Sequence, residues 1–153
     1  MSAEPRQAIR TVWVLNGPNL GRLGSREPEI YGHVDEAGLR GLVATWGEAV
    51  GVAVRLRQTD DEAQLIEWLH EAADGAVPVI LNPAAFTHYS YAVRDAVADL
   101  TARGVPLIEV HLSNPASREA FRQVSVISEV ASGTIAGFGV DSYRLALVAL
   151  AGT

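Results

Sequence analysis

Apolar residues gather in five short runs along the chain, and amphipathic stretches separate these runs. The first run, TVWVL at residues 11–15, is rich in β-branched and aromatic side chains, which predicts a buried strand. Residues 52–57 alternate between apolar and polar side chains, which is typical of an edge strand. Three further strands are predicted at residues 77–81, 106–110 and 134–138.

Between these runs, apolar residues recur at the spacing of a helix. A first helix is predicted after Asp35, a residue type that caps helix N-termini. The sequence TDDE at residues 59–62 has the form of a capping box and predicts the start of a second helix. A third helix should end near Gly104, a short one is expected around residues 117–122, and the last covers residues 142–150.

The strands and helices alternate as five β–α units. This alternation predicts an α/β fold in which a parallel sheet carries helices on both faces. With five strands, we expect the flavodoxin-like, doubly wound order 2-1-3-4-5, with three layers α/β/α. Residues 1–10 are polar and are expected to be a flexible N-terminal tail, so that residues 11–153 form a single flavodoxin-like domain.

Composition removes several kinds of chemistry. The 153 residues include 12 arginines, but no lysine and no cysteine. A lysine Schiff base, a P-loop lysine and a thiolate nucleophile or metal ligand are therefore excluded. The net charge of −6 argues against nucleic acid or an anionic membrane as a partner. The N-terminus has no long apolar run, and the lack of cysteine fits a cytoplasmic protein.

Polar clusters follow three of the predicted strands. They are NGPN at residues 16–19, Asn82 with the nearby His88, and HLSN at residues 111–114. In a doubly wound sheet, the ligand binds beyond the carboxyl ends of the strands. We therefore expect these clusters to converge on one site. The clusters lack the glycine pattern of a dinucleotide-binding loop.

A long glycine-bearing loop, residues 20–32, follows the first cluster, and loops of this length are often lids. It contains Arg26 and Tyr31. A tyrosine is a useful base only as the phenolate, and a nearby guanidinium favours that form. Spacing alone leaves a second interpretation open, in which the tyrosine packs over the loop and the arginine is exposed.

His111 can act as an acid, a base or a ligand. Glu109 precedes it by two residues and so shares its face of the strand, where it could orient the imidazole or favour its charged form. A histidine that is merely hydrogen-bonded at a strand end is the alternative. His70, in the middle of a predicted helix, is expected to be structural or exposed. No two histidines have metal-ligand spacing, so no metal is predicted.

Taken together, these features resemble the type II 3-dehydroquinate dehydratases. The resemblance covers residues 12–150 and is carried by four ordered segments. They are LNGPNL with LGSREPEIYG (residues 15–20 and 23–32), EAQLIEWLHEA (62–72), NPAAFTHYSYAVRDA (82–96), and IEVHLSN with REAFR (108–114 and 118–122). The resemblance implies dehydration of 3-dehydroquinate to 3-dehydroshikimate by anti elimination through an enolate, with no cofactor.

The resemblance also assigns catalytic roles. Tyr31 would take the proton at C2, and Arg26 would favour the phenolate and position the lid. Asn19 would stabilise the enolate oxygen, through a water molecule. His111, oriented by Glu109, would protonate the departing C1 hydroxyl.

Substrate-binding roles and partners follow from the same resemblance. Asn82, His88 and Arg122 would hold ring hydroxyls, and the backbone amides of Leu112 and Ser113 would bind the carboxylate. Asp95 would reach the site of a neighbouring subunit. The family is commonly dodecameric, as a tetramer of trimers, so a homo-oligomer is expected.

Several positions depart from the family pattern, and two of these departures bear on the choice of substrate. Tyr89 follows His88 where a small residue is usual, close enough to alter the pocket, and PAS at residues 115–117 replaces a segment that commonly carries a histidine. They keep a second hypothesis open: a diverged relative that acts on another cyclic hydroxy-ketone or serves as a regulatory subunit. A third hypothesis is a flavodoxin-like module that binds a flavin or a small anion without catalysis. The sequence does not distinguish biosynthesis from quinate breakdown.

Overall fold

The computed structural model describes residues 11–152, and the tail predicted at residues 1–10 lies outside them. Five parallel strands form one sheet in the order β2-β1-β3-β4-β5, which confirms the predicted order. The strands are β1 (Thr11–Asn16), β2 (Ala53–Gln58), β3 (Val79–Asn82), β4 (Leu107–His111) and β5 (Gly133–Ala136). Each lies within two residues of its predicted bounds.

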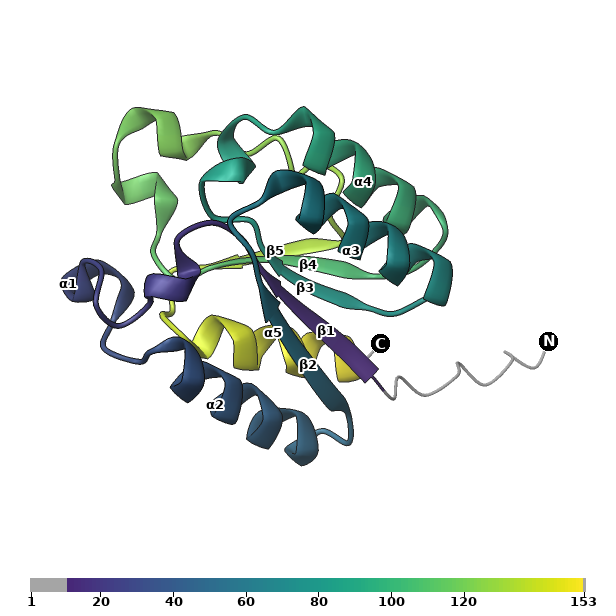
Figure 1. The fold of residues 1–153 in the computed structure, drawn as a ribbon, viewed down its shortest axis with the longest axis horizontal. Helices are drawn as coiled ribbons and strands as arrows, with labels where there is room; N and C mark the ends of the chain where they lie inside the picture. Colours follow the sequence, from purple (N-terminus) through teal and green to yellow (C-terminus); the bar gives the residue numbers. More distant parts are fainter. Residues whose placement is uncertain (1–10, 153) are drawn as a thin grey trace.

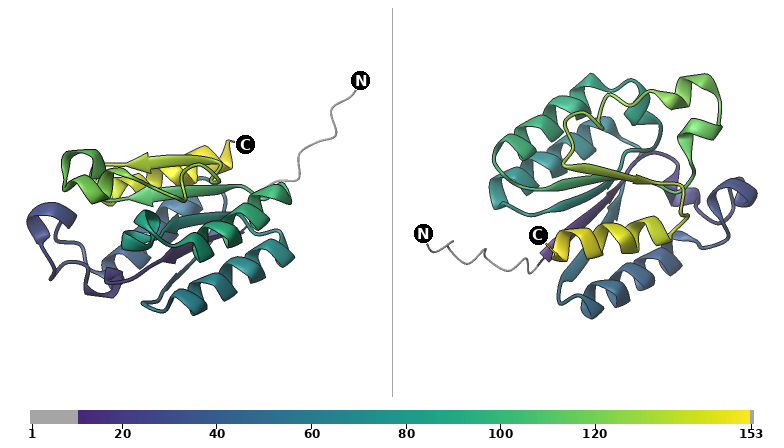
Figure 2. Two further views of the ribbon diagram at one scale, coloured as in Figure 1. Left: turned by 90° about the horizontal axis from the view of Figure 1, so that it is seen from above. Right: turned by 180° about the vertical axis from the view of Figure 1, so that it is seen from behind.

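Helices cover both faces of the sheet (Figure 1). One face carries α2 (Glu36–Ala49) and α5 (Asp141–Ala151), and the other carries α3 (Glu62–Gly75) and α4 (Tyr91–Ala102). The two further views in Figure 2 show the same three layers from above and from behind. The predicted α/β/α architecture is therefore confirmed.

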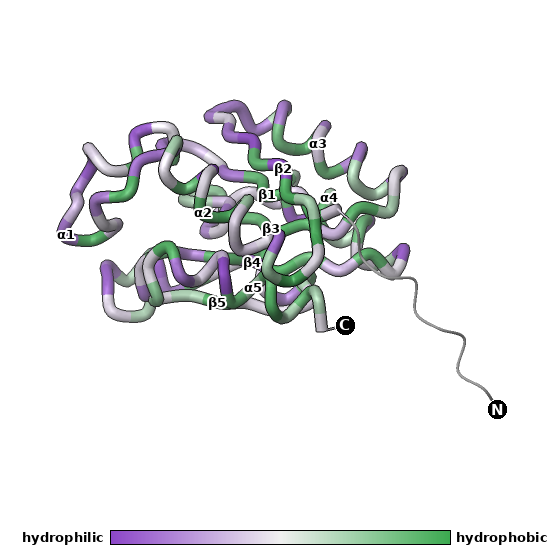
Figure 3. The backbone as a smooth tube through the Cα atoms, turned by 90° about the horizontal axis from the view of Figure 1, so that it is seen from below, coloured by the Kyte–Doolittle hydropathy of each residue, from purple (hydrophilic) through white to green (hydrophobic). Residues whose placement is uncertain are grey.

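The core lies in two apolar layers, one on each side of the sheet. On β1, Val12 and Val14 face α2 and α5, whereas Leu15 faces α3 and α4. This alternation follows from the period of two along a strand. All three side chains are fully buried, and burial of such a side chain stabilises a fold by about 1.5–3 kcal/mol. Figure 3 shows the hydrophobic colour concentrated along the central strands.

The start of α2 is as predicted, but the start of α3 is not. Asp35 caps α2, because its carboxylate accepts a hydrogen bond from the backbone N–H of Gly38. The capping box expected from Thr59 is wrong, because Asp61 is the N-cap of α3 and accepts from the N–H of Ala63. Thr59 still belongs to the end of the sheet, where its N–H donates to the carbonyl of Asn16.

Three connections contain more or different helix than predicted. Residues 20–32 hold a 3-10 turn, η1 (Leu20–Arg22), and a short helix, α1 (Pro28–Tyr31). The helix expected around residues 117–122 is instead two 3-10 turns, η3 (Pro115–Ser117) and η4 (Ala120–Gln123). Another 3-10 turn, η2 (Ala84–His88), follows β3. Between residues 11 and 152, no helix is long and apolar enough to cross a membrane.

Candidate active site

A cavity of about 540 Å³, its open mouth included, lies at the carboxyl ends of β1, β3 and β4. Figure 1 shows α1 and the segment after β4 projecting at this same end of the sheet. Four residues with predicted catalytic roles line the cavity: Asn19, Arg26, Tyr31 and His111. Five residues with predicted binding roles also line it: Asn82, His88, Leu112, Ser113 and Arg122. The predicted convergence of the three polar clusters is therefore confirmed.

The turn that carries Asn19 is held by close backbone packing. A side chain at Gly17 would come within 2.8 Å of the carbonyl oxygen of Pro83, so only glycine fits there. Asn19 itself has the left-handed φ of 68°, and its N–H donates to the carboxylate of Asp60 at 2.8 Å. Gln58 also donates to the carbonyl of Gly17. Sequence analysis gave neither Gln58 nor Asp60 a role, although Gln58 ends β2 and Asp60 follows it at the same edge of the sheet.

Tyr31 lies between two arginines. The guanidinium carbon of Arg26 is 5.0 Å from the centroid of the tyrosine ring, and that of Arg118 is 5.2 Å from it. Arg118 also donates a hydrogen bond to the hydroxyl of Ser113. Two guanidinium groups therefore pack on the ring of Tyr31 inside the cavity. Sequence analysis gave Arg118 no role at the site. Its segment, REAFR at residues 118–122, belongs to the family resemblance, but only Arg122 in that segment was assigned a function.

His111 rests on a buried carboxylate. Its Nε2–H donates to Oε2 of Glu109 at 2.5 Å, a contact that the strand spacing predicted. Glu109 is fully buried and also accepts hydrogen bonds from the hydroxyls of Thr87, Ser125 and Ser128. These three hydroxyls were not anticipated: Thr87 lies in the unpredicted turn η2, and the segment after η4, which carries Ser125 and Ser128, gives no sequence signal for its return to β4.

His111, together with the neighbouring hydroxyls, decides the charge of Glu109. Burial acts to raise the pKa of Glu109, but the hydrogen bonds and charge of His111, together with the bonds of Ser128 and Thr87, outweigh it. The net result is a pKa below the ordinary value for a glutamate. The carboxylate is therefore ionised at neutral pH and able to stabilise a positive charge on His111.

The lowered pKa of Glu109 links folding to pH. Its stabilising contribution is complete above the unfolded-state pKa and is lost as the pH falls through the folded-state pKa. We expect Glu109→Gln to destabilise the protein at pH 7, by roughly 1–3 kcal/mol, since hydrogen-bonded groups lose their ionised partner. This difference from the wild type should shrink below about pH 4, as measured by thermal unfolding across the pH range.

The control for this acid dependence is Asp141→Asn. Asp141 pairs with Arg144 at the surface, and that contact also lowers the pKa of its carboxyl. An exposed pair of this kind contributes little to stability. A Glu109→Gln effect that is constant with pH, or no larger than the Asp141→Asn effect, would contradict the proposed ionised state.

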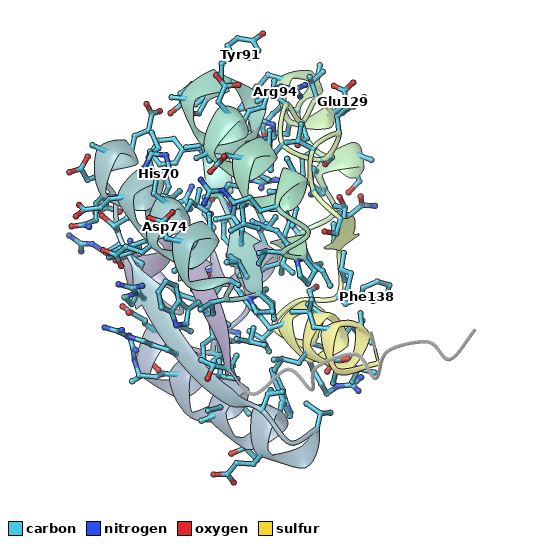
Figure 4. All side chains as sticks on the ribbon, turned by 90° about the vertical axis from the view of Figure 1, so that its right-hand side faces the viewer. His70, Asp74, Tyr91, Arg94, Glu129 and Phe138 are labelled. Atoms are coloured by element: carbon cyan, nitrogen blue, oxygen red, sulfur yellow. The ribbon has the colours of Figure 1, made fainter. Side chains whose placement is uncertain are left out.

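On the opposite side of the cavity, His88 is fixed by its neighbours. Its Nδ1–H donates to the carbonyl of Val124, and its ring meets that of Phe121 edge-on. Arg122 donates to the carboxylate of Glu119 while it lines the cavity. The other histidines lie elsewhere: His70 is exposed on the outer side of α3, as predicted (Figure 4), and His33 is exposed as well.

Two residues that the sequence connected with the pocket do not line it. Asp95 is exposed on α4, away from the buried face of Val93 and Val97, as its helical position predicted. Tyr89 is 58% exposed and packs edge-on against Phe86. The expectation that Tyr89 alters the pocket is therefore wrong, because the C-terminal end of η2 turns its ring outward.

The described residues contain no cluster of three or more His, Asp or Glu side chains that could hold a metal ion. What the cavity does contain is a phenol between two cations and an imidazole on an ionised carboxylate. Groups of this kind move protons to and from a bound molecule. The flavodoxin-like fold and this site together define an enzyme of the acid–base class.

The comparisons with known proteins identify the family. A family model for class II dehydroquinase matches residues 10–151. Relatives named 3-dehydroquinate dehydratase include one from Salinispora arenicola, 59% identical over 92% of this chain and 96% of its own, and one from Halalkalibacterium halodurans, 50% identical over 93% and 96%. A crystal structure of type II dehydroquinase from Propionibacterium acnes is 49% identical, with a TM-score of 0.91 over 94% of this chain and 97% of its own. The chain belongs to the class II dehydroquinase family.

Proposed function

We propose that the chain is a hydro-lyase that converts 3-dehydroquinate to 3-dehydroshikimate and water. The observation that carries this proposal is that Tyr31, flanked by two guanidinium groups, and His111, backed by ionised Glu109, line one cavity. The reaction needs a base for a carbon acid and an acid for a poor leaving group. It needs no cofactor, and the chain has neither the lysine nor the cysteine for covalent catalysis.

The first step forms the enolate. The Tyr31 phenolate takes the proton from C2, next to the C3 ketone, and the electrons of the broken C–H bond move to the ketone oxygen. The contacts of Arg26 and Arg118 with the ring hold Tyr31 in place in the cavity. Asn19 stabilises the enolate oxygen, and its turn is held rigid by Asp60, so little reorganisation is needed as charge develops.

The second step expels water. The enolate returns to the ketone, a double bond forms between C1 and C2, and the C1–O bond breaks. Since Nε2 of His111 is committed to Glu109, the other ring nitrogen gives its proton to the departing hydroxyl. Tyr31 then carries one proton more and His111 one fewer, and exchange with solvent restores both.

The remaining groups hold the substrate. Asn82, His88 and Arg122 bind ring hydroxyls, and the backbone amides of Leu112 and Ser113 bind the carboxylate. This proposal is supported by their common location on the cavity wall. Donors of this kind suit a carboxylate and several hydroxyls. Residues 11–153 would act as one catalytic domain in the cytoplasm, with which the cysteine-free sequence is compatible.

Direct assay tests the proposed function. The purified protein is mixed with 3-dehydroquinate, and the conjugated enone of the product is followed by ultraviolet absorbance. We expect turnover that persists in the presence of a metal chelator. Absence of turnover, or release of a flavin on denaturation, would contradict the proposal. Comparable turnover of another cyclic hydroxy-ketone would favour a diverged relative. Tyr89 no longer supports that hypothesis, because its side chain does not line the cavity.

The protein is also proposed to form a homo-oligomer, a dodecamer built as a tetramer of trimers. Phe121 and Val124 are exposed beside His88 on the cavity wall, and Tyr89 and Tyr91 are exposed at the start of α4; we define these four residues as an apolar patch. Tyr91 projects outward at the end of α4 (Figure 4), and Asp95 lies one turn further along the same helix face. A second copy on this patch would bring Asp95 to its neighbour's site.

A charge in the apolar patch should break the assembly. We expect wild-type protein to have twelve times the 16.3 kDa mass of the chain, and Tyr91→Glu to shift it to smaller species with reduced turnover. The physical reason is the cost of burying an unpaired carboxylate in an apolar interface. Light scattering after size exclusion measures both masses.

The matched control is Phe138→Glu, because Phe138 is 63% exposed and lies away from the patch (Figure 4). It should leave the mass unchanged. A monomeric, fully active wild type would refute the assembly.

A further inference from the structure

Three buried polar side chains lie behind the cavity, on the side of the sheet that α5 covers. Tyr143 of α5 is fully buried, and it meets Asn16 at the end of β1 and Asn82 at the end of β3. The two asparagines face each other in register across the two neighbouring strands. Asn82 alone of the three lines the cavity. These three side chains therefore connect α5, which does not line the cavity, to Asn82 on the cavity wall.

We infer that Tyr143 is a positioning residue, which fixes the amide of Asn82 so that an N–H, rather than a carbonyl oxygen, is offered to the substrate. The inference rests on the proposed function, because it concerns how that substrate is held. Tyr143 has no role in the reaction itself, since it does not line the cavity.

The hydrogen bonds have only one consistent direction. The single O–H of Tyr143 donates to Oδ1 of Asn16 at 2.8 Å, so its oxygen must accept from the Nδ2 group of Asn82 at 2.9 Å. Oδ1 of Asn82 in turn accepts from the N–H of Ala84 at 3.2 Å. Rotating the Asn82 amide by half a turn would break both of its bonds. One Nδ2 hydrogen of Asn82 is used in this relay, and the second is left for a ligand oxygen.

The chemistry of the phenol keeps this direction fixed. Burial raises the pKa of Tyr143 strongly, and its hydrogen bonds with Asn82 and Asn16 only partly oppose that effect. The hydroxyl therefore stays protonated wherever the protein is folded. Nδ2 of Asn16 has no partner among the described residues, so Asn16 acts in the relay through its oxygen. A substrate with an acceptor oxygen at this position is selected.

The test is a double-mutant cycle on steady-state kinetics. Tyr143→Phe keeps the ring and removes the hydroxyl that directs Asn82. We expect KM to rise about threefold to tenfold with kcat nearly unchanged, because a binding contact common to ground and transition states is weakened. In an Asn82→Ala background, the same Tyr143→Phe change should have no further effect on KM. If the role of Tyr143 were purely structural, its substitution would have the same effect in both backgrounds.

The matched control is Leu147→Val, a change of a buried apolar residue one turn along the same helix that takes no part in the hydrogen bonds of the relay. It should lower the melting temperature and leave KM unchanged. If Tyr143→Phe does not fold, Asn16→Leu removes the acceptor that sets the direction of the relay and should raise KM in the same way.

The outcomes separate the two proposals. Wild-type turnover with an unchanged KM in Tyr143→Phe overturns the inference alone. Equal effects of Tyr143→Phe in the wild-type and Asn82→Ala backgrounds also overturn it. A wild type that does not dehydrate 3-dehydroquinate overturns the proposed function instead.

Discussion

Tyr31→Phe is expected to reduce kcat by about 10²- to 10⁴-fold, the usual contribution of a positioned acid or base. KM should stay within about threefold, because the ring remains between Arg26 and Arg118 and only the oxygen is lost. No other phenol lines the cavity, within the part of the chain that the structure describes, so none can replace the missing base. Steady-state turnover of 3-dehydroquinate measures the effect.

Tyr89→Phe is the control for this substitution. It removes a hydroxyl from a tyrosine that is 58% exposed and outside the cavity, so turnover should match that of the wild type. Normal turnover in Tyr31→Phe would eliminate Tyr31 as the base. A large loss in both variants would show that the effect of a lost tyrosine hydroxyl is not specific to the cavity.

Sequence patterns predicted the fold because the sheet is parallel and buried on both faces. Such strands are short apolar runs, and their order follows from the alternation with helices. The patterns failed where a local hydrogen bond competes with the predicted start of a helix. Thr59 looked like a helix cap, but its backbone completes the pairing of β2 with β1 and delays the helix to Asp61. The lid was expected to be irregular, although Pro28 at a helix N-terminus favours the short helix that forms there.

Site residues were predictable where a strand ends or where spacing has a fixed period. His111 and Glu109 share a strand face, and that spacing gave their contact. The missed residues come from segments that return to the site over long sequence distances. Ser128 reaches Glu109 from a turn after η4, and Tyr143 reaches Asn82 from the last helix, 61 positions along the chain. The periodicity of a sequence describes one helix or strand at a time, so it does not predict contacts between residues of distant elements.

His111→Ala should also lower the rate of product formation by about 10²- to 10⁴-fold, through loss of the proton donor for the leaving hydroxyl. The change leaves Glu109 buried without its imidazole hydrogen-bond donor, which destabilises the fold. Thermal unfolding must therefore accompany the kinetics, and added imidazole should partly restore turnover by occupying the vacated space. His70→Ala, a change on the exposed side of α3, is the control and should leave turnover unaltered.

Solvent exchange at C2 separates the proposed acid from the proposed base. The enolate forms before water leaves, so a variant that lacks only the acid can still remove and return the C2 proton. In deuterated water, His111→Ala should exchange this proton into 3-dehydroquinate while making little product, as followed by nuclear magnetic resonance. Tyr31→Phe should lose both exchange and product. Exchange abolished in His111→Ala would mean that this histidine acts in enolate formation, and exchange retained in Tyr31→Phe would assign the base to another group.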